Sequence, residues 1–579
     1  MIAGSKRRFA GTCSVFVLMC CAADVAASPS GTAKLSADMI LYNGKVLTVD
    51  SKFSTKTVIV ISDGKIVATG GKELLRRYRA GQEIDLRGRV AMPGFMDTHF
   101  HPSAISHRAI DASTAGSIEE LKKMVAAKAA ELGPGEWVTG AGWAEDRFAE
   151  RRNPTRRDLD EAAPNNPVAI HRAGGHSIVG NSMALKLAHL DRTSPNPERG
   201  VFERDQDGEL NGIIRERTNI YVSLVPPDSP SALRDGYIAD LRRLTRLGIT
   251  SLIVASASIG DEVDEVLRPE MPKTALTFRQ LQDIYALKGY DLPRASVEIS
   301  YPGHDALARY PHKTGYGDDR LRLGAIGEMP AVDGGFTGPT AWTTRPYRGQ
   351  PDFHGQPFFK DESDLEALAT DVADRGWQLG LHAIGDAAID MATRVYARVI
   401  EKHKLTDHRW YLAHYTMLPS EDSIALMRRD AIWASAQPNF LYNLEVRYLQ
   451  TLDGAALEHN NPVAVPAARG VSFAFGSDNL PVDPRVGLYA AVTRRGPSGR
   501  VYGKEEAVSI EKAISYYTAA GPFLTHEEKL KGTLEPGKLA DLIVLDSDPT
   551  AIAPENLLTM QIDLTIVGGR VVYDRSKGN

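Results

Sequence analysis

Cysteine is almost absent from the sequence. The 579 residues include three cysteines, and all of them lie near the amino terminus, at Cys13, Cys20 and Cys21. Removal of an amino-terminal segment that contains them would leave a mature chain without any thiol. Disulfide bonds and thiolate metal ligands are therefore excluded from such a mature protein.

Residues 1–27 have the pattern of a removable export signal peptide. Basic residues come first, an apolar run follows and small residues end the segment, at Lys6-Arg7-Arg8, Val15–Ala23 and Val25-Ala26-Ala27. The apolar run is too short to span a bilayer, so no membrane insertion is expected after signal removal. We expect an exported protein, periplasmic or secreted. A lipoprotein ranks second, because Met19 is a poor residue to precede a lipid-modified Cys20.

A strong charge of either sign is also lacking. The chain has 68 lysines and arginines against 73 aspartates and glutamates, which gives a net charge of -5. No basic stripe indicates nucleic acid or an anionic membrane surface as a partner. We therefore expect local chemistry on a small-molecule substrate, and we leave open whether the chain forms a homo-oligomer.

Both ends of the mature chain carry short strand patterns. Residues 38–70 alternate in strand fashion, with hairpin turns at Asn43-Gly44 and Asp63-Gly64, and residues 541–545 and 565–573 are again β-branched runs. A small β-sandwich-like domain formed from residues 28–92 and 532–579 would explain this symmetry. A mature chain of about 550 residues is long enough for more than one domain.

The middle of the chain, residues 93–531, alternates apolar strands with amphipathic helices. One helix begins at the cap Ser117, with Glu120 three residues later, and stops at Gly133-Pro134. Apolar strands recur downstream, each with room for a helix before the next, at 250–254, 321–326, 378–381, 410–413 and 471–475. Repeated βα units predict an α/β fold with a TIM-like (β/α)8 barrel, interrupted by a long insertion at about residues 102–235.

Two histidines, His99 and His101, follow a short apolar run one residue apart. Side chains alternate faces along a strand, so both imidazoles point the same way and converge on one spot. This arrangement supplies two nitrogen ligands to a metal ion. The alternative is that two histidines fall at this spacing in a surface loop, and for an isolated pair that alternative is favoured.

Three further strand patterns end in possible metal ligands. In a barrel of this type, reactive side chains lie at the carboxyl ends of strands, where the sequence places His382, His414 and Asp478. Each of these residues alone is more often a capping residue. Together with His99 and His101, however, they repeat the same pattern, in which a possible metal ligand stands at the end of a strand. Nitrogen and oxygen donors of this kind favour one or two divalent ions, of the zinc, manganese or nickel kind.

These residues resemble those of the amidohydrolase superfamily, and more narrowly its branch that contains N-substituted formamide deformylases (amidohydrolase family 3 type). The resemblance covers nearly the whole mature chain and rests on 93–101, 382–386, His414, 476–478 and 532–542, with 142–146, 175–177 and 211–216 in the insertion. It implies a metal-dependent hydrolase of non-peptide C–N bonds, with Zn²⁺ as the expected ion. His99, His101, His382, His414 and Asp478 would be its ligands.

The sequence departs from the family at the end of the expected fourth strand. Where many members have a lysine that bridges two metals, the run Leu321–Gly334 has none, and Glu328 stands nearest. A carboxylate also offers two oxygens to two cations, so Glu328 is a candidate bridge. The alternatives are an ordinary loop acid beside a single metal, or Glu216 as the bridging residue.

Substrate contacts are expected in the insertion, where a barrel enzyme builds its pocket walls. We assign them to Trp143, His176 and Glu216, although a loop-packing role for Trp143 and His176 is equally compatible with the sequence.

The reaction expected from this site is metal-assisted hydrolysis of an amide-type bond. Asp478 would carry a proton from water to the leaving nitrogen, as general base and then general acid. Asp97 or Asp386 would orient the histidines. The alternatives are an ester, lactone or phosphoester hydrolase, a ring deaminase, and a noncatalytic exported binding protein.

Overall fold

The computed structural model describes residues 34–145, 147–172, 177–197, 200–260, 276–287, 292–337 and 339–578. The expected export signal, its cysteines and His176 lie outside these residues. Within these ranges, no helix combines the length and the apolar character that a membrane span needs.

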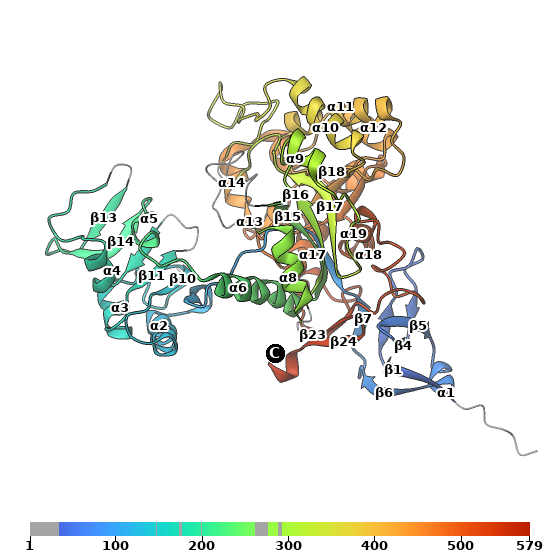
Figure 1. Ribbon diagram of the computed structural model, residues 1–579, viewed down its shortest axis with the longest axis horizontal. Coiled ribbons are helices and arrows are strands. Elements are labelled where there is room, and N and C mark those ends of the chain that lie inside the picture. Colours follow the sequence, from blue (N-terminus) through green and yellow to red (C-terminus); the bar gives the residue numbers. More distant parts are fainter. Residues whose placement is uncertain are drawn as a thin grey trace, which may run out of the picture.

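Eight parallel strands form the centre of the molecule (Figure 1). In spatial order they are β8 (Phe95–Phe100), β15 (Ile249–Ala257), β16 (Arg294–Ile299), β17 (Leu321–Glu328), β18 (Leu379–Ala383), β19 (Tyr411–His414), β20 (Trp433–Ala436) and β21 (Ser472–Phe475). The chain after β21 lies against β8 and so joins the last strand to the first. There, Asp478 N donates a hydrogen bond to the His99 carbonyl at 2.8 Å. The predicted α/β barrel is confirmed.

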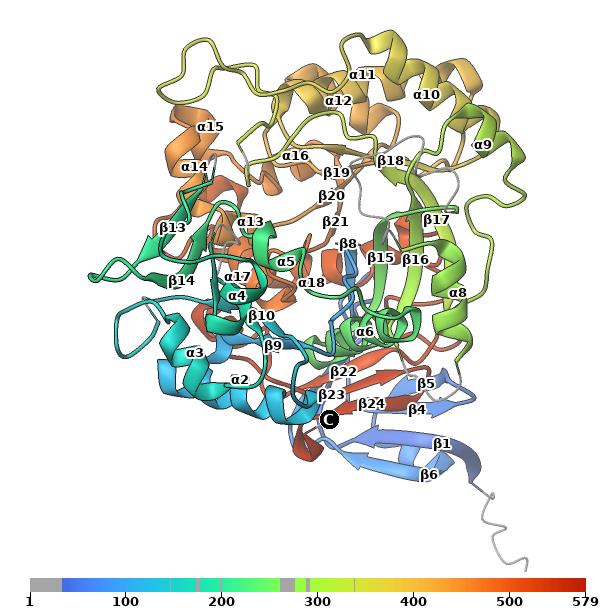
Figure 2. The same ribbon diagram turned by 60° about the vertical axis from the view of Figure 1, so that its left-hand side comes forward.

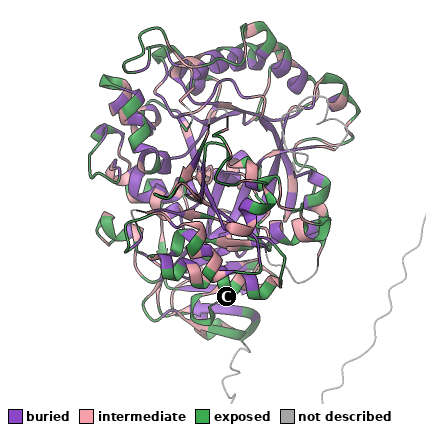
Figure 3. Cartoon of the chain, turned by 90° about the vertical axis from the view of Figure 1, so that its left-hand side faces the viewer, coloured by how far each residue is buried: buried purple, intermediate pink, exposed green. Residues whose placement is uncertain are grey.

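Helices cover the outside of this barrel, because its strands are apolar on both faces as in most parallel sheets. The main ones are α6 (Pro230–Arg243), α8 (Phe278–Ala286), α10 (Glu362–Asp374), α11 (Asp386–His403), α12 (Glu421–Arg429), α17 (Pro484–Thr493) and α18 (Ile510–Tyr517). Strand residues such as Leu252, Val297 and Leu381 pack in one core with the helices. Figure 3 shows buried residues along the strands and exposed ones on the outer helix faces.

The two chain ends meet in a small β domain below the barrel, as the sequence predicts. The strand β7 (Val90–Pro93) pairs with β22 (Leu542–Leu545) in antiparallel register and with β2 (Lys45–Leu47) on its other side. Its two sheets also contain β1 (Leu35–Tyr42), β3 (Thr55–Lys56), β4 (Val58–Ser62), β5 (Lys65–Gly70), β6 (Tyr78–Asp85), β23 (Ile562–Val567) and β24 (Arg570–Asp574). The exact domain boundaries stay predictions.

The insertion between β8 and β15 forms a separate sheet beside the barrel (Figures 1 and 2). Its strands are β9 (Ala109–Asp111), β10 (Val138–Trp143), β11 (Val168–Arg172), β12 (Ser177–Gly180), β13 (Val201–Arg204) and β14 (Leu210–Arg215), and its helices include α2 (Ile118–Leu132), α3 (Arg156–Ala162), α4 (Ser182–Leu187) and α5 (Asn219–Val222). The expected cap of α2 is present, since the Ser117 hydroxyl accepts from Glu120 N at 3.1 Å.

A buried ion pair connects the β domain to the barrel. Arg294, at the start of β16, donates from Nε to Asp541 Oδ2 at 2.7 Å and from Nη2 to Asp541 Oδ1 at 3.2 Å. The side chains are 6% and 4% exposed. Asp541 also accepts from Gly568 N at 2.7 Å, so its carboxylate joins β16 to the chain between β23 and β24.

We expect Asp541→Ala to lower the free energy of unfolding by about 3–5 kcal/mol, because the buried Arg294 guanidinium would keep only the half-exposed Asp319 as an ionic partner. Urea unfolding followed by circular dichroism would measure the change. The control is Glu366→Ala, which removes a partly exposed partner of Arg398 while Glu362 remains as its other partner, and it should change the free energy by about 0.5 kcal/mol or less. Equal stability of the two variants would contradict the prediction.

Candidate metal centre

The structure brings all the predicted metal ligands together at the carboxyl ends of the barrel strands. His99 lies in β8 and His101 directly follows it, while Glu328, His382 and His414 lie in β17, β18 and β19. Asp478 follows β21, and its backbone N donates a hydrogen bond to the carbonyl of His99 in β8. Five strands from distant parts of the sequence therefore contribute to one cluster.

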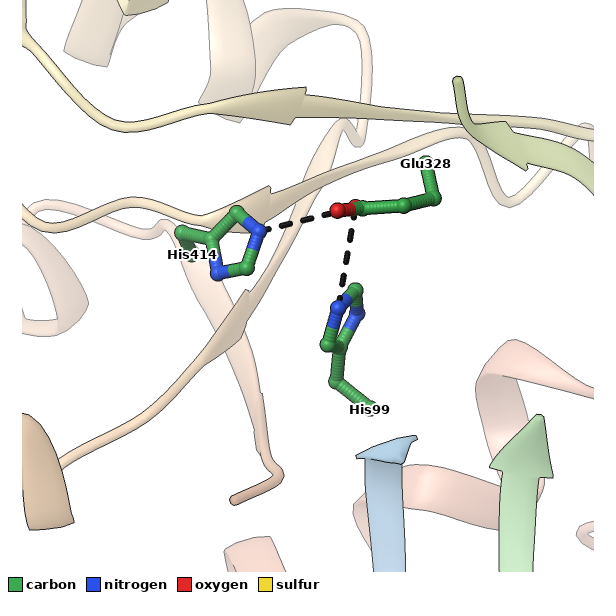
Figure 4. A group of neighbouring side chains, drawn as sticks. All are labelled: His99, Glu328 and His414. Atoms are coloured by element: carbon green, nitrogen blue, oxygen red, sulfur yellow. Dashed lines mark ion pairs between the residues drawn. The ribbon is translucent and has the colours of Figure 1, made fainter. Parts of the chain in front are cut away.

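Glu328 lies at the centre of this cluster (Figure 4). Its Oε2 is 3.6 Å from His99 Nε2 and 3.5 Å from His414 Nε2. Its Oε1 is 3.1 Å from His382 Nδ1. Oε1 thus faces His382, and Oε2 faces both His99 and His414, so each oxygen of the carboxylate is directed at a possible ligand.

A second group of possible ligands shares His99 with the first. His101 Nε2 lies 3.2 Å from Asp478 Oδ1 and 3.2 Å from His99 Nε2. His99 Nε2 and Asp478 Oδ1 are 3.8 Å apart. Among the described residues, His99, Glu328 and His414 form one potential metal-binding triplet, and His99, His101 and Asp478 form the other.

Burial and charge act in opposite directions on the groups of the cluster. Burial lowers the pKa of His99 to about 3, which keeps its imidazole neutral. Burial opposes the charged form of Glu328 too, but the charge of His382, whose own pKa is raised to about 9, and its hydrogen bond hold the pKa of the Glu328 carboxyl well below the usual value. The pKa of Asp478 is lowered, against burial, by its hydrogen bond with His101 and the neighbouring histidine charges. Both carboxylates are therefore ionised at neutral pH.

The donor atoms of the cluster fit a divalent cation. Glu328 Oε2 and His414 Nε2 are buried and have no hydrogen-bond partner among the described residues. A buried polar atom without a partner costs about 1–3 kcal/mol, and a coordinated cation removes that cost for the atoms it contacts. Imidazole nitrogens and carboxylate oxygens suit ions of the zinc, manganese or nickel kind.

Gln437, which the sequence prediction missed, fixes the orientation of His414. Its Oε1 accepts from His414 Nδ1 at 3.0 Å, and its own Nε2 donates to Ser435 O at 3.1 Å. The proton is thereby held on Nδ1, which leaves the Nε2 lone pair directed at Glu328 and the centre. The sequence feature that could have identified Gln437 is its position directly after β20, at the carboxyl end of the seventh barrel strand.

Asp97 and Asn479 hold the last strand end against the first. Asp97 Oδ1 accepts from His99 N at 3.0 Å and from Ser477 N at 2.9 Å. Asn479 pairs in both directions with the backbone of His101, at 3.1 and 2.8 Å. Asp97 therefore positions His99 through its backbone. Asp386, the other expected orienting acid, instead accepts from Thr344 N at 3.0 Å.

Gly476 allows the chain after β21 to lie close to β8. A Cβ at Gly476 would stand 2.6 Å from His99 N, closer than side-chain atoms come. Any other residue would push β21 away from β8, and Asp478 with it.

An acid that the sequence prediction missed lies in the barrel interior. Glu298 of β16 is fully buried and accepts a hydrogen bond from the Tyr411 hydroxyl. Burial raises its pKa to about 8, against the opposing effect of that hydrogen bond, so the carboxyl is protonated at neutral pH. It adds no negative charge to the neighbouring centre.

Trp143 and Glu216, the expected substrate contacts that the structure describes, are not part of the cluster. Trp143 is 1% exposed, packs in the core of the insertion and donates from Nε1 to Ile170 O at 2.9 Å, which favours the packing alternative. Glu216 is exposed just after β14 and belongs to neither ligand triplet of the described residues. Glu328 is therefore favoured over Glu216 as the bridging acid, because Glu328 lies within the cluster and Glu216 does not.

Comparison with known proteins identifies the same family that the sequence motifs resemble. The model of the amidohydrolase family matches residues 82–573. YtcJ of Bacillus subtilis strain 168 is 26% identical over 93% of this chain and 99% of its own length. The N-substituted formamide deformylase of Arthrobacter pascens is 27% identical over 93% of this chain and 99% of its own length.

A solved structure has the same fold. It is the crystal structure of an uncharacterized metal-dependent hydrolase from Pyrococcus horikoshii OT3, with a TM-score of 0.64 and 24% identity. The likeness covers 89% of this chain and 99% of that one.

We expect Gln437→Ala to weaken zinc binding by about 10- to 100-fold, because His414 would lose the acceptor that fixes its tautomer. Competition with a chromogenic zinc chelator would measure the affinity. Asn443→Ala, at the end of α13 (Asn439–Asn443), serves as the control and should bind zinc as the unmodified protein does. Unchanged affinity in Gln437→Ala would remove Gln437 from the positioning role.

Proposed function

This chain belongs to the amidohydrolase family, and on that premise we propose that it is an exported enzyme that hydrolyses the amide-type C–N bond of a small, non-peptide molecule. The observation that carries the proposal is the cluster of four histidines and two carboxylates at the barrel mouth. The similarity to an N-substituted formamide deformylase supports an amide as the substrate. Export rests on the signal pattern of residues 1–27.

The residues that we propose to hold the metal are those whose side chains face one another in the cluster. We assign His99, His101 and Asp478 to one position and His382 and His414 to another, with Glu328 between the two. Zn²⁺ is the ion that we propose, because neutral imidazoles and carboxylates form its usual non-thiolate sites. When bound, a divalent ion supplies activated water and polarises the substrate carbonyl.

Asp478 is the residue that we propose to move the proton. Its carboxylate is ionised, so it can accept a proton from the attacking water, and it then donates that proton to the leaving nitrogen. The side chain is 21% exposed, in contrast to the fully buried side chain of His99. Asp478 therefore reaches the solvent side of the cluster, where a substrate would enter.

Other reactions would use the same site with a different leaving group. An ester, lactone or phosphoester needs less help from a proton donor than an amine does, and a ring deaminase releases ammonia. The noncatalytic alternative, an exported binding protein, is disfavoured because the cluster retains every expected ligand as well as Asp478.

We expect chelation to abolish hydrolysis and added zinc to restore it, because the family's reaction depends on a divalent ion. The measurement is turnover of a panel of N-formyl, N-acyl, carbamoyl and cyclic amides, with matched esters beside them. Full activity in a preparation shown to be metal-free would contradict the proposed function. Turnover of the esters alone would move it to the ester hydrolase alternative.

We expect Asp478→Asn to lower kcat by about 100-fold or more while most of the zinc stays bound, since an amide cannot accept the proton but the histidines and Glu328 remain. Zinc content and kcat would be measured on the same preparation. The comparison is His99→Ala, which should lose zinc and activity together because His99 belongs to both ligand groups. A zinc-loaded Asp478→Asn enzyme with near-normal kcat would exclude the proton transfer.

A further inference from the structure

We propose that a cavity at the amino-terminal face of the barrel, away from the metal centre, binds a planar aromatic anion such as an aryl carboxylate. The cavity lies between α9 (His304–Arg309), the segment that follows it and the turn before β18. Its volume is about 490 Å³, within the range of roughly 300–1,000 Å³ that is usual for small-molecule sites.

The cavity and the metal centre lie at opposite ends of the same strands. Lining residues 310–316 precede β17, whose far end carries Glu328, and Trp377 precedes β18, which carries His382. The extended chain from Trp377 to His382 spans about 16 Å. A ligand in this cavity would therefore not touch the groups of the proposed reaction.

Four aromatic side chains line the cavity and form one connected cluster. The buried Trp377 lies beside Tyr310, with ring centroids 6.2 Å apart and planes inclined by 31°. Tyr310 meets His312 edge to face with centroids 5.7 Å apart, and His312 stacks on Tyr316 with centroids 3.4 Å apart and planes inclined by 10°. Tyr316 is 41% exposed, so part of its ring surface is accessible. Aromatic rings at the cavity wall favour a planar ligand.

Two cations lie at the edge of the cavity and specify a negative group on that ligand. The Lys313 ammonium stands 3.6 Å from the place of a Cβ on Gly376, and so lies over the turn between Arg375 and Trp377. Lys313 takes part in no ion pair within the part of the chain that the structure describes. Arg375 is partly neutralised, because its Nε donates to Asp371 at 2.9 Å. Lys313 is therefore the main cation available to an anionic ligand.

The test is calorimetric titration of the zinc-loaded enzyme with 2-naphthoate. We expect saturable binding, and binding about fivefold weaker or worse for the neutral 2-naphthalenemethanol, which keeps the rings and lacks the charge. Absence of saturable binding up to millimolar naphthoate, or equal affinity for the neutral probe, would overturn the proposal.

Variants locate the binding site. Lys313→Gln should weaken naphthoate binding about fivefold and leave kcat/KM unchanged, whereas Lys72→Gln, an exposed lysine of the small β domain, should change neither. Because a carboxylate can also ligate the metal centre, His99→Ala is titrated in parallel and should bind naphthoate normally. Binding that is lost in His99→Ala but kept in Lys313→Gln would place the ligand at the metal centre and overturn the proposal.

Discussion

The buried carboxylate of Glu328 is the group on which the geometry of the site depends. An isolated carboxylate in such a position would cost several kcal/mol. Its two oxygens face imidazoles from β8, β18 and β19, so these strands must end at one level around β17. The same oxygens present negative charge to a cation. One interaction therefore sets both the alignment of the strand ends and the kind of ligand that the barrel mouth accepts.

The supports of this cluster come from hydrogen bonds to backbone and to ring nitrogens. Asp97 and Asn479 hold the chain after β21 against β8, and Gln437 holds His414 in one tautomer. These residues contact the ligands and not the expected position of a cation. Their contribution is to fix the direction of each lone pair, which decides whether several donors can reach one ion together.

Sequence patterns predicted the barrel and pointed to the strand-end residues of the cluster because both follow local rules, whereas Glu328 was reached through the family resemblance. His382 and His414 were identified as strand-end residues, and strand ends are visible in the hydrophobic pattern. Gln437 and Glu298 were missed because their roles depend on neighbours in other strands, His414 and Tyr411, which no local pattern reveals. Trp143 is of a residue type that often lines pockets, but its burial is set by the packing of the insertion sheet.

Assembly of the site requires the whole barrel. His99 and Asp478 are separated by nearly 380 residues, yet their cluster depends on the hydrogen bond from Asp478 N to His99 O that joins the last strand end to the first. The β domain unites the two chain ends on the other face, through β7 and β22. An ion bound by His99, Asp478 and Glu328 would bind the folded barrel, and so would stabilise the folded chain by an amount that grows with the ratio of free ion concentration to its dissociation constant. Metal affinity and fold stability are thus linked through the same strand ends.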